Sequence, residues 1–205
     1  MLLPDDFYTN DNVVEIAKAL LGKVLFTQIN NEICSGIIVE TEAYAGINDK
    51  ASHAYGGKRT TRTEIMYRKG GCAYIYLIYG MYSLFNVVTN IEGIPHAVLV
   101  RSIFPYQGID IMEKRLGVNI LKKNVGIGPG RLSKLMGFDY KMSGTTLSKS
   151  EISDAIWIEN QSIVISDKEI KSGKRIGVSY AGEDAELHYR FWIEPEINYF
   201  FKKDY

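Results

Sequence analysis

The stretch that decides the fold is KVLFTQINNEICSGIIVETEAY, residues 23–44. Residues 23–29 form an apolar run with β-branched side chains, and residues 32–44 form a second, longer run. Asn30 and Asn31 lie between them, and two turn-forming residues between two such runs indicate a β-hairpin. We therefore expect an antiparallel sheet that extends outward from this hairpin.

The segment before the hairpin predicts a short amphipathic helix over residues 12–21. Asn12 can cap its first turn, Glu15 can complete a capping box three residues later, and Gly22 follows its end. The apolar side chains recur at helical spacing at Val13, Ile16, Ala17 and Leu20.

The segment after the hairpin predicts further strands with two more helices. Three strands are expected, over 72–78, 81–89 and 97–104, the first two meeting at Tyr79 and Gly80. Helices are expected over 109–116 and between the glycine-rich loop 126–130 and Gly137. Four shorter strands are expected over 155–159, 162–166, 175–179 and 187–193. The pattern predicts one α+β domain over residues 1–205 with a mainly antiparallel sheet, and a functional loop at 45–71.

The composition limits the class of protein. The 24 basic and 24 acidic side chains give a formal net charge of zero, which does not by itself indicate a nucleic-acid partner. Two cysteines and three scattered histidines fit neither a disulfide framework nor a zinc site. The N-terminus lacks a signal-peptide pattern, and no apolar stretch approaches the roughly 20 residues of a membrane span. We expect a reduced, cytoplasmic protein without a structural metal.

Two carboxylates in the apolar run 37–44 are the first candidates for chemistry. Strand alternation puts Glu40, Glu42 and Tyr44 on one face. One interpretation is a solvated face with ion-paired glutamates. The other is a general base beside an aromatic platform, because burial lifts the pKa of a glutamate toward the working range.

Aromatic and polar side chains on the next strands are the second candidates. Tyr74 and Tyr76 share a face, and Tyr79 lies at the expected turn. Tyr79 either folds back onto the sheet or serves as a wedge between base pairs. Asn86 is either a plain strand residue or a reader of base edges, and Arg101 forms either a surface ion pair or a phosphate contact. The glycine-rich loop either binds an anion at a helix N-terminus or simply leads into the helix.

Taken together, these strings resemble the alkyladenine (3-methyladenine, methylpurine) DNA glycosylase family. The resemblance rests on the order and spacing of VETEAY at 39–44, YLIYGMY at 76–82, Leu99 to Arg101 and the Gly-Pro-Gly loop, and it extends from about residue 20 to 193. It implies a compact fold on a curved antiparallel sheet with flanking helices, and no metal or cofactor.

The resemblance also implies roles for individual residues. Glu42 would activate the attacking water, and Tyr79 would fill the gap left in the duplex. The base pocket would consist of Tyr44, His53, Tyr76, Asn86 and Leu99, where Asn86 disfavours normal guanine. Contacts to DNA or its phosphates would come from Arg101, Arg131, Lys134 and Arg175.

By the same resemblance, the chain would flip alkylated or deaminated purines out of double-stranded DNA and hydrolyse the N-glycosidic bond. The substrates would be drawn from 3-methyladenine, 7-methylguanine, hypoxanthine and ethenoadenine. No lysine stands in these strings to form a Schiff base, so we expect no strand cleavage. We expect a compact bacterial-type monomer that acts at the nucleoid. The alternatives are a non-catalytic binder of distorted DNA and a formyltransferase-like or RNA-binding domain.

Overall fold

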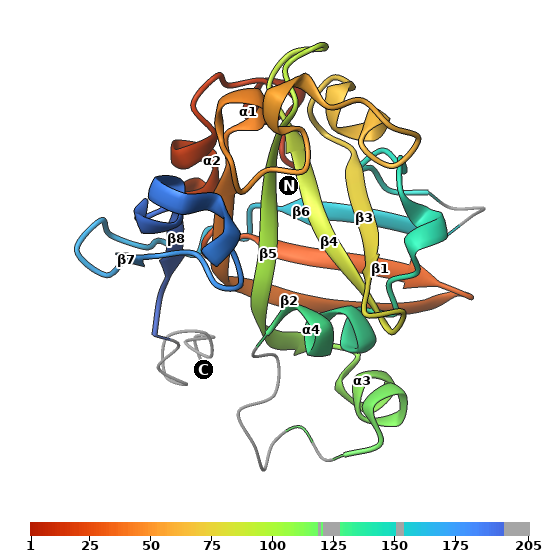
Figure 1. Ribbon diagram of the computed structural model, residues 1–205. Coiled ribbons are helices and arrows are strands. Elements are labelled where there is room, and N and C mark those ends of the chain that lie inside the picture. The colour runs from red at the N-terminus through yellow and green to blue at the C-terminus, as the bar shows by residue number, and fades with distance from the viewer. Residues whose placement is uncertain (119, 121–127, 151–153, 195–205) are drawn as a thin grey trace.

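The chain is an eight-stranded antiparallel sheet with helices around it, in a computed structural model that describes residues 1–118, 120, 128–150 and 154–194 (Figure 1). Neighbouring strands follow the order β3-β4-β5-β2-β1-β6, β8 pairs with β2, and β7 pairs with β8. This confirms the predicted α+β class. Within the described ranges, none of the helices has the length and apolar character that a membrane crossing requires.

The elements have the following bounds. The strands are β1 Val24–Ile29, β2 Glu32–Tyr44, β3 Ala73–Ile78, β4 Tyr82–Thr89, β5 His96–Gln107, β6 Ala155–Glu159, β7 Lys171–Gly173 and β8 Arg190–Trp192. The α-helices are α1 Asp5–Tyr8, α2 Val13–Ala19, α3 Ile109–Leu116 and α4 Pro129–Met136. Short 3₁₀ segments are η1 Gly46–Asn48, η2 Tyr55–Gly57, η3 Glu64–Tyr67, η5 Tyr140–Met142 and η6 Ser179–Glu186.

The hairpin of β1 and β2 forms as predicted. Its turn residues Asn30 and Asn31 have φ angles of 52° and 62°, the left-handed conformation that a two-residue hairpin turn requires and that asparagine tolerates. Ile29 and Glu32 pair directly across this turn.

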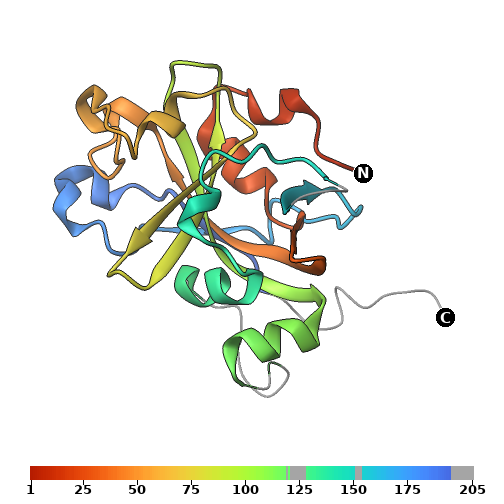
Figure 2. The same cartoon turned by 90° about the vertical axis from the view of Figure 1, so that its right-hand side faces the viewer.

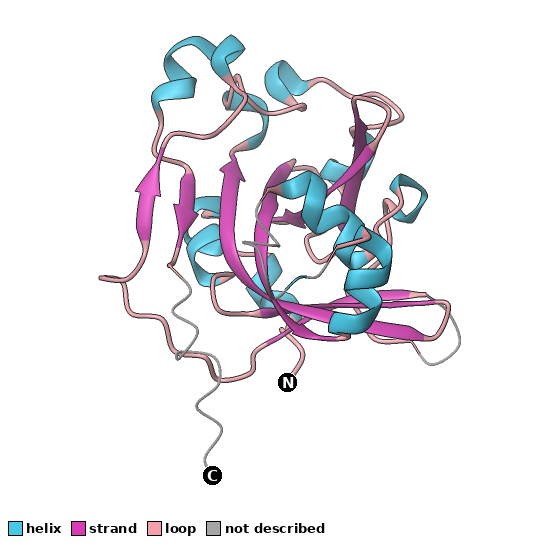
Figure 3. Cartoon of the chain, turned by 90° about the horizontal axis from the view of Figure 1, so that it is seen from below, coloured by secondary structure: helices cyan, strands magenta, loops and turns pink. Residues whose placement is uncertain are grey.

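Strand β2 is the strand around which the sheet is organised. Its first half lies between β1 and β5, while Glu40–Glu42 lies between β5 and β8. The register against β5 shifts on both sides of Glu40, and such irregularities bend a strand. The sheet therefore curves so strongly that β1 and β6 run across β3 and β4, and the helices lie around it instead of forming a layer (Figures 1 and 3).

The helix before the hairpin is α2, and its cap is the predicted one. The Asn12 side chain accepts hydrogen bonds from the amides of Val14 and Glu15 at 3.1 and 3.2 Å. The predicted capping box is wrong in its second half. The Asn12 amide donates to Asn10, and the Glu15 carboxylate pairs with Lys18 instead.

Two of the expected short strands are absent from the described chain. Residues 162–166 form an irregular loop. Ile163 and Ile165 pack against the core from this loop, so the alternation of apolar and polar residues reflects the burial of these two side chains and not a strand. Residues 175–179 do not form a strand because Gly177 adopts a φ of 79° and the side chain of Arg175 turns inward. Strand β7 forms just before them, in a polar segment that carries no strand signal.

Other boundaries differ less. Strand β5 continues to Gln107, past Pro105. Proline has no backbone N–H to donate, and the strand tolerates it because the pairing between β5 and β2 is irregular at this position. Strand β8 is three residues long. Helices α3 and α4 form as predicted, whereas Gly126 and Ile127 of the glycine-rich loop lie outside the described residues.

Two irregular segments that are far apart in the sequence lie side by side at one edge of the molecule (Figure 2). The loop 45–71 contacts the segment 174–188, where the Lys50 amide donates to Asp184 at 2.7 Å and the Tyr180 hydroxyl donates to the Ala51 carbonyl at 3.1 Å. Together with the ends of β3, β4 and β5, these segments enclose the candidate site.

Candidate active site

A cavity of about 470 Å³ opens between these segments and the sheet. Its walls come from the strands β2 to β5, the loop 45–71, the first residue of α4 and residues 176–180. The lining includes most of the side chains that the sequence singled out: Tyr44, His53, Tyr74, Tyr76, Tyr79, Asn86, Leu99 and Arg101.

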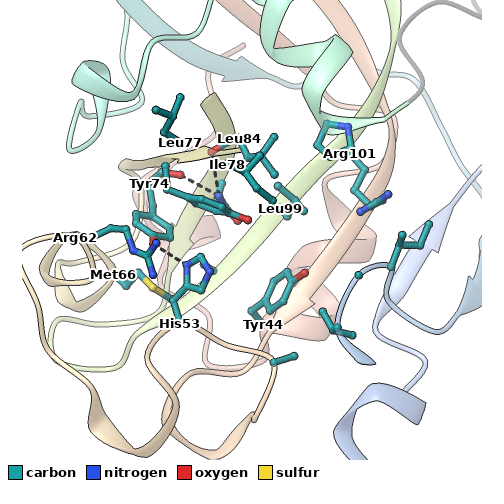
Figure 4. Close-up of a pocket in the computed structure, with 18 of the residues that line it drawn as sticks. Tyr44, His53, Arg62, Met66, Tyr74, Leu77, Ile78, Leu84, Leu99 and Arg101 are labelled. Carbon is teal, nitrogen blue, oxygen red and sulfur yellow. Dashed lines mark hydrogen bonds between the residues drawn. The ribbon is translucent and has the colours of Figure 1, made fainter. Parts of the chain in front are cut away.

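One wall of the cavity is aromatic. The His53 ring meets Tyr76 edge-on at 4.6 Å between ring centroids, and Tyr74 and Tyr76 lie 5.4 Å apart. His53 Nδ1 is 2.8 Å from the Tyr74 hydroxyl, which fixes the orientation of the imidazole. Tyr44 lies across the cavity from His53 (Figure 4). A planar group can therefore enter between Tyr44 and the wall of His53 and Tyr76.

The imidazole in this wall is neutral at physiological pH. Burial and, to a lesser extent, the nearby cations Arg62 and Lys58 together lower the pKa of His53 to about 4. A neutral ring hydrogen-bonds and stacks without adding a positive charge to the pocket.

Glu42 lies behind the opposite wall with no exposed surface. Its carboxylate accepts hydrogen bonds from the Tyr44 hydroxyl and from the Ile176 amide, both at 2.8 Å, and Arg101 Nη1 lies 3.2 Å away. These three donors belong to residues that line the cavity. Burial raises the pKa of Glu42, while Arg101, Ile176 and Tyr44 act to lower it and Glu40 raises it. The site thus holds a carboxyl group with the desolvated environment of a general base.

Glu40 has a different, supporting environment. Its carboxylate accepts hydrogen bonds from Arg101 Nε at 3.0 Å, from the Ser102 hydroxyl at 2.9 Å and from Arg190 Nη1 at 3.2 Å. Arg101 therefore bridges both carboxylates from one guanidinium group and is 8% exposed. Both glutamates are thus ion-paired with Arg101, and they differ in burial, since the side chain of Glu42 has no exposed surface whereas that of Glu40 is 13% exposed.

Asn86 and Leu99 pair across β4 and β5 and form part of the cavity wall. The Asn86 amide nitrogen donates to the carbonyls of Tyr74 and Leu84, at 3.0 and 3.3 Å. These bonds fix the amide group against the sheet, so its position in the pocket is rigid.

Tyr79 projects from the hairpin of β3 and β4 with 83% of its surface exposed. The alternative in which it folds back onto the sheet is wrong. Tyr79 and Gly80 both adopt positive φ angles, 53° and 67°, which turn the chain tightly and leave the ring at the tip. Met81 beside it is 65% exposed.

Of the four expected contacts to DNA or its phosphates, Arg101 is 8% exposed and pairs with Glu40 and Glu42, and the other three divide into two groups. Arg131 and Lys134 are exposed on α4, whose first residue lines the cavity. Arg175 is instead 5% exposed, and its guanidinium group binds Asp49 and the carbonyls of Ala43 and Asp184. This placement corrects the assignment of Arg175 to a phosphate contact, since both terminal nitrogens are directed into the protein.

The lining also includes residues that the sequence analysis did not single out, among them Arg62, Ile176 and Tyr180. Arg62 belongs to a basic cluster with Lys58 and Arg59, which was the available signal. Ile176 and Tyr180 reach the cavity only through the packing of a remote loop, for which no local pattern exists.

The arrangement suits hydrolysis at a group attached to a planar ring. It offers an aromatic slot, a buried carboxyl group and an exposed aromatic tip at the rim. Within the described ranges, no group of three or more histidine, cysteine, aspartate or glutamate side chains could hold a metal ion.

Comparison with known proteins gives a family. The family of methylpurine-DNA glycosylases (MPG) matches residues 6–196. The chain is 44% identical over 202 residues to the "Putative 3-methyladenine DNA glycosylase" of Clostridium perfringens (strain 13 / Type A), with 95% of this chain and 96% of that protein covered.

Proteins of the same name give similar matches. That of Chlamydia abortus (strain DSM 27085 / S26/3) is 44% identical over 193 residues, covering 94% of this chain and 98% of its own. The protein of Bacillus cereus (strain AH820) is 42% identical over 202 residues, which cover 95% of this chain and 96% of that protein. These matches leave the formyltransferase-like, RNA-binding and non-catalytic alternatives without support. The chain belongs to the methylpurine-DNA glycosylase family and is a DNA N-glycosylase, a hydrolase of DNA repair.

Proposed function

We propose that this glycosylase flips a damaged purine out of duplex DNA into the aromatic cavity and hydrolyses its N-glycosidic bond with a water activated by Glu42. The purines are alkylated or deaminated bases: 3-methyladenine, 7-methylguanine, hypoxanthine and ethenoadenine. The observation that supports this most directly is the buried Glu42 carboxylate, which is hydrogen-bonded to Tyr44 and Ile176 and ion-paired with Arg101, three residues that line the cavity.

The aromatic groups favour the flipped state. Extrusion of a base costs a few kcal/mol, and stacking on an aromatic side chain returns roughly 1–3 kcal/mol per base. Tyr44 and Tyr76 supply the stacking faces, and Tyr79 enters the duplex in place of the base. Because His53 is neutral, these electron-rich rings attract a cationic alkylated purine without an opposing charge in the wall.

The carboxylate then acts as a general base. A carboxylate has about four acceptor positions, and Tyr44, Ile176 and Arg101 take three of them among the described residues. The fourth accepts a proton from water, whose oxygen bonds to the sugar C1′. The bond from C1′ to the purine nitrogen breaks, its electron pair leaves with the base, and an abasic sugar remains. General base catalysis of this kind contributes about 10²–10⁴ in rate.

The experiment measures base release directly. A duplex with one hypoxanthine or ethenoadenine is incubated with the enzyme and then treated with hot alkali, which cleaves the strand at an abasic site. A parallel assay follows 3-methyladenine released from alkylated DNA. We expect release by the wild type and by Glu15→Gln, an exposed matched control, and lesion binding without release by Glu42→Gln. Full activity of Glu42→Gln would refute the role of Glu42.

We further propose that the enzyme is monofunctional. None of the described residues that line the cavity is a lysine, so no amine stands ready to form a Schiff base with the sugar. We expect no strand cleavage before alkali and no covalent complex on borohydride treatment. A trapped complex would contradict this.

The relatives named above are bacterial. We propose that the chain acts as a monomer on chromosomal DNA in the cytoplasm, at the nucleoid. Sedimentation at micromolar concentration tests the monomer, and a dimer mass would refute it.

A further inference from the structure

A buried ion pair lies behind the cavity, outside the residues that line it. Arg175 and Asp49 are 5% and 3% exposed. Both terminal nitrogens of Arg175 bind the Asp49 carboxylate, with Nη2 to Oδ1 at 2.8 Å, in the bidentate geometry that makes such pairs directional.

Asp49 organises the loop that leads to His53. Its two oxygens also accept hydrogen bonds from the amides of Ala45 and Ala51, both at 3.0 Å. The conformation of the chain between Tyr44 and His53 therefore depends on this one carboxylate.

Arg175 fixes the other side of the site. It donates to the carbonyl of Ala43 at 2.9 Å, and its guanidinium carbon lies 4.9 Å from the ring centroid of Tyr44 and 5.3 Å from that of Tyr189. The next residue, Ile176, donates its amide proton to Glu42.

We propose that Asp49 and Arg175 form a clamp that positions the catalytic groups: it holds the Ile176 amide on the Glu42 carboxylate and supports the back of the Tyr44 ring. Both members of the clamp are buried and neither lines the cavity, so we treat them as positioning residues. This inference rests on the proposed role of Glu42 as the base.

The clamp makes a specific prediction about pH dependence. Several titratable or charged groups surround Glu42. They are Tyr44 and Glu40 on β2, Tyr76 on β3, Arg101 on β5, Arg190 on β8, and Arg175 and Tyr180 from the loops. Of the groups that stabilise its ionised form, the clamp supports the ring of Tyr44 and holds the amide of Ile176, which directly follows Arg175 in the chain and is the more exposed to its loss. Loss of that donor raises the pKa of Glu42, so the rise of activity with pH moves to higher pH.

The first test compares Arg175→Lys, Asp49→Asn and the double variant in single-turnover excision of hypoxanthine. Lysine keeps the charge but not the bidentate geometry, and asparagine keeps the shape but not the charge. We expect each to slow excision by about 10–10²-fold, because a misplacement of about 1 Å costs up to 10²-fold. The double variant should be no slower than the slower single variant, because both changes disable one unit.

The second test removes the donor itself. Ile176→Pro lacks the amide proton, and Ile176→Ala keeps it as a matched control. We expect the rising limb of the pH–rate profile to move to higher pH in Ile176→Pro and Arg175→Lys, and to stay in Ile176→Ala. Arg115→Lys is the distant control, because Arg115 likewise binds a carboxylate and a carbonyl, but on α3 away from the cavity.

The outcomes separate the two proposals. If Glu42→Gln is inactive, two results would overturn the clamp alone. One is a wild-type rate in both Arg175→Lys and Asp49→Asn. The other is slow excision together with a lower melting temperature and an unchanged rising limb of the pH–rate profile. Full activity of Glu42→Gln would overturn the role of Glu42 and the clamp with it.

Discussion

At the scale of single residues, Glu42 links burial to chemistry. Its carboxyl group has no exposed surface, and burial raises its pKa more than Arg101, Ile176 and Tyr44 lower it. The charged form that a general base requires is therefore less stable in the folded protein than in the unfolded chain. The function proposed for this position therefore opposes stability, which is common at catalytic sites.

This opposition predicts the effect of Glu42→Gln on stability. The folded pKa lies above the unfolded one, so the unfavourable contribution is absent at low pH and develops as the pH rises through the folded pKa. We expect Glu42→Gln to melt at a higher temperature than the wild type at pH 7, and the gain to shrink toward pH 4. Calorimetry at both pH values checks this, with Glu15→Gln as the exposed control. A lower melting temperature at pH 7 would contradict it.

Tyr79 shows the reverse case, a residue with little part in folding. Its 83% exposure predicts that Tyr79→Ala changes the free energy of unfolding by less than about 0.5 kcal/mol. Loss of the wedge should lower kcat/KM on a lesion duplex by about 5–150-fold, corresponding to roughly 1–3 kcal/mol of stacking. Tyr79→Phe keeps the ring and should retain most activity. Equal activity of the alanine and phenylalanine variants would rule out the wedge.

At the scale of elements, β2 and α2 carry the site. The Thr41 hydroxyl donates to the Ala17 carbonyl at 2.8 Å, so the end of α2 is joined to β2 next to Glu42. Gly36 permits β2 to cross β5, because a Cβ there would lie 2.5 Å from Ile103 Cδ1.

Gly36 gives a prediction about this crossing. Gly36→Ala should destabilise the fold by about 1–3 kcal/mol, because the added methyl group also meets the fixed Cβ of Ile103 at 2.8 Å. Urea unfolding measures the change. Ser35→Ala, at the neighbouring buried position, removes a hydroxyl that has no hydrogen-bond partner in the described chain and should cost nothing. Equal stabilities of Gly36→Ala and Ser35→Ala would refute the close approach.

The N-terminal cap of α2 gives a second prediction about a single element. Asn12→Ala should lower the free energy of unfolding by about 1 kcal/mol, because two amides lose their acceptor. Asn12→Asp keeps an acceptor and should be nearly neutral in urea unfolding. A neutral alanine variant would show that the helix is held by packing alone.

At the scale of the whole molecule, zero net charge coexists with a cationic surface beside the cavity. Arg62 lines the rim, and Arg131 and Lys134 extend from α4. DNA affinity depends on such local charge and not on the sum over the molecule.

This arrangement predicts salt dependence. The logarithm of the affinity for duplex DNA should fall with log[salt], by about 0.9 for each phosphate contact. Arg131→Ala and Lys134→Ala should each reduce that slope by about one unit and weaken damaged and undamaged DNA alike, as fluorescence anisotropy would show. Lys168→Ala, an exposed lysine that does not line the cavity, is the control. If the slope of log affinity against log[salt] is unchanged in the α4 variants, the DNA phosphates do not contact Arg131 or Lys134.

The sequence by itself determined most of the local elements and the positions of the residues proposed for the chemistry. The β1–β2 hairpin, the Asn12 cap, the tip at Tyr79 and the shared face of Glu40, Glu42 and Tyr44 follow from spacing and residue type, because these features depend on neighbours within a few positions. The ordered strings between residues 39 and 101 also pointed to the right family.

Only the tertiary structure decided which residues from distant segments contact one another. Local patterns cannot show that Arg175 turns inward to Asp49, that Ile176 donates to Glu42, or that Ile163 and Ile165 pack from a loop. Each of these contacts joins segments far apart in the chain, and their partners are set by how the curved sheet packs against its loops. Burial also separated the two glutamates, since spacing made Glu40 and Glu42 equivalent and desolvation distinguishes them.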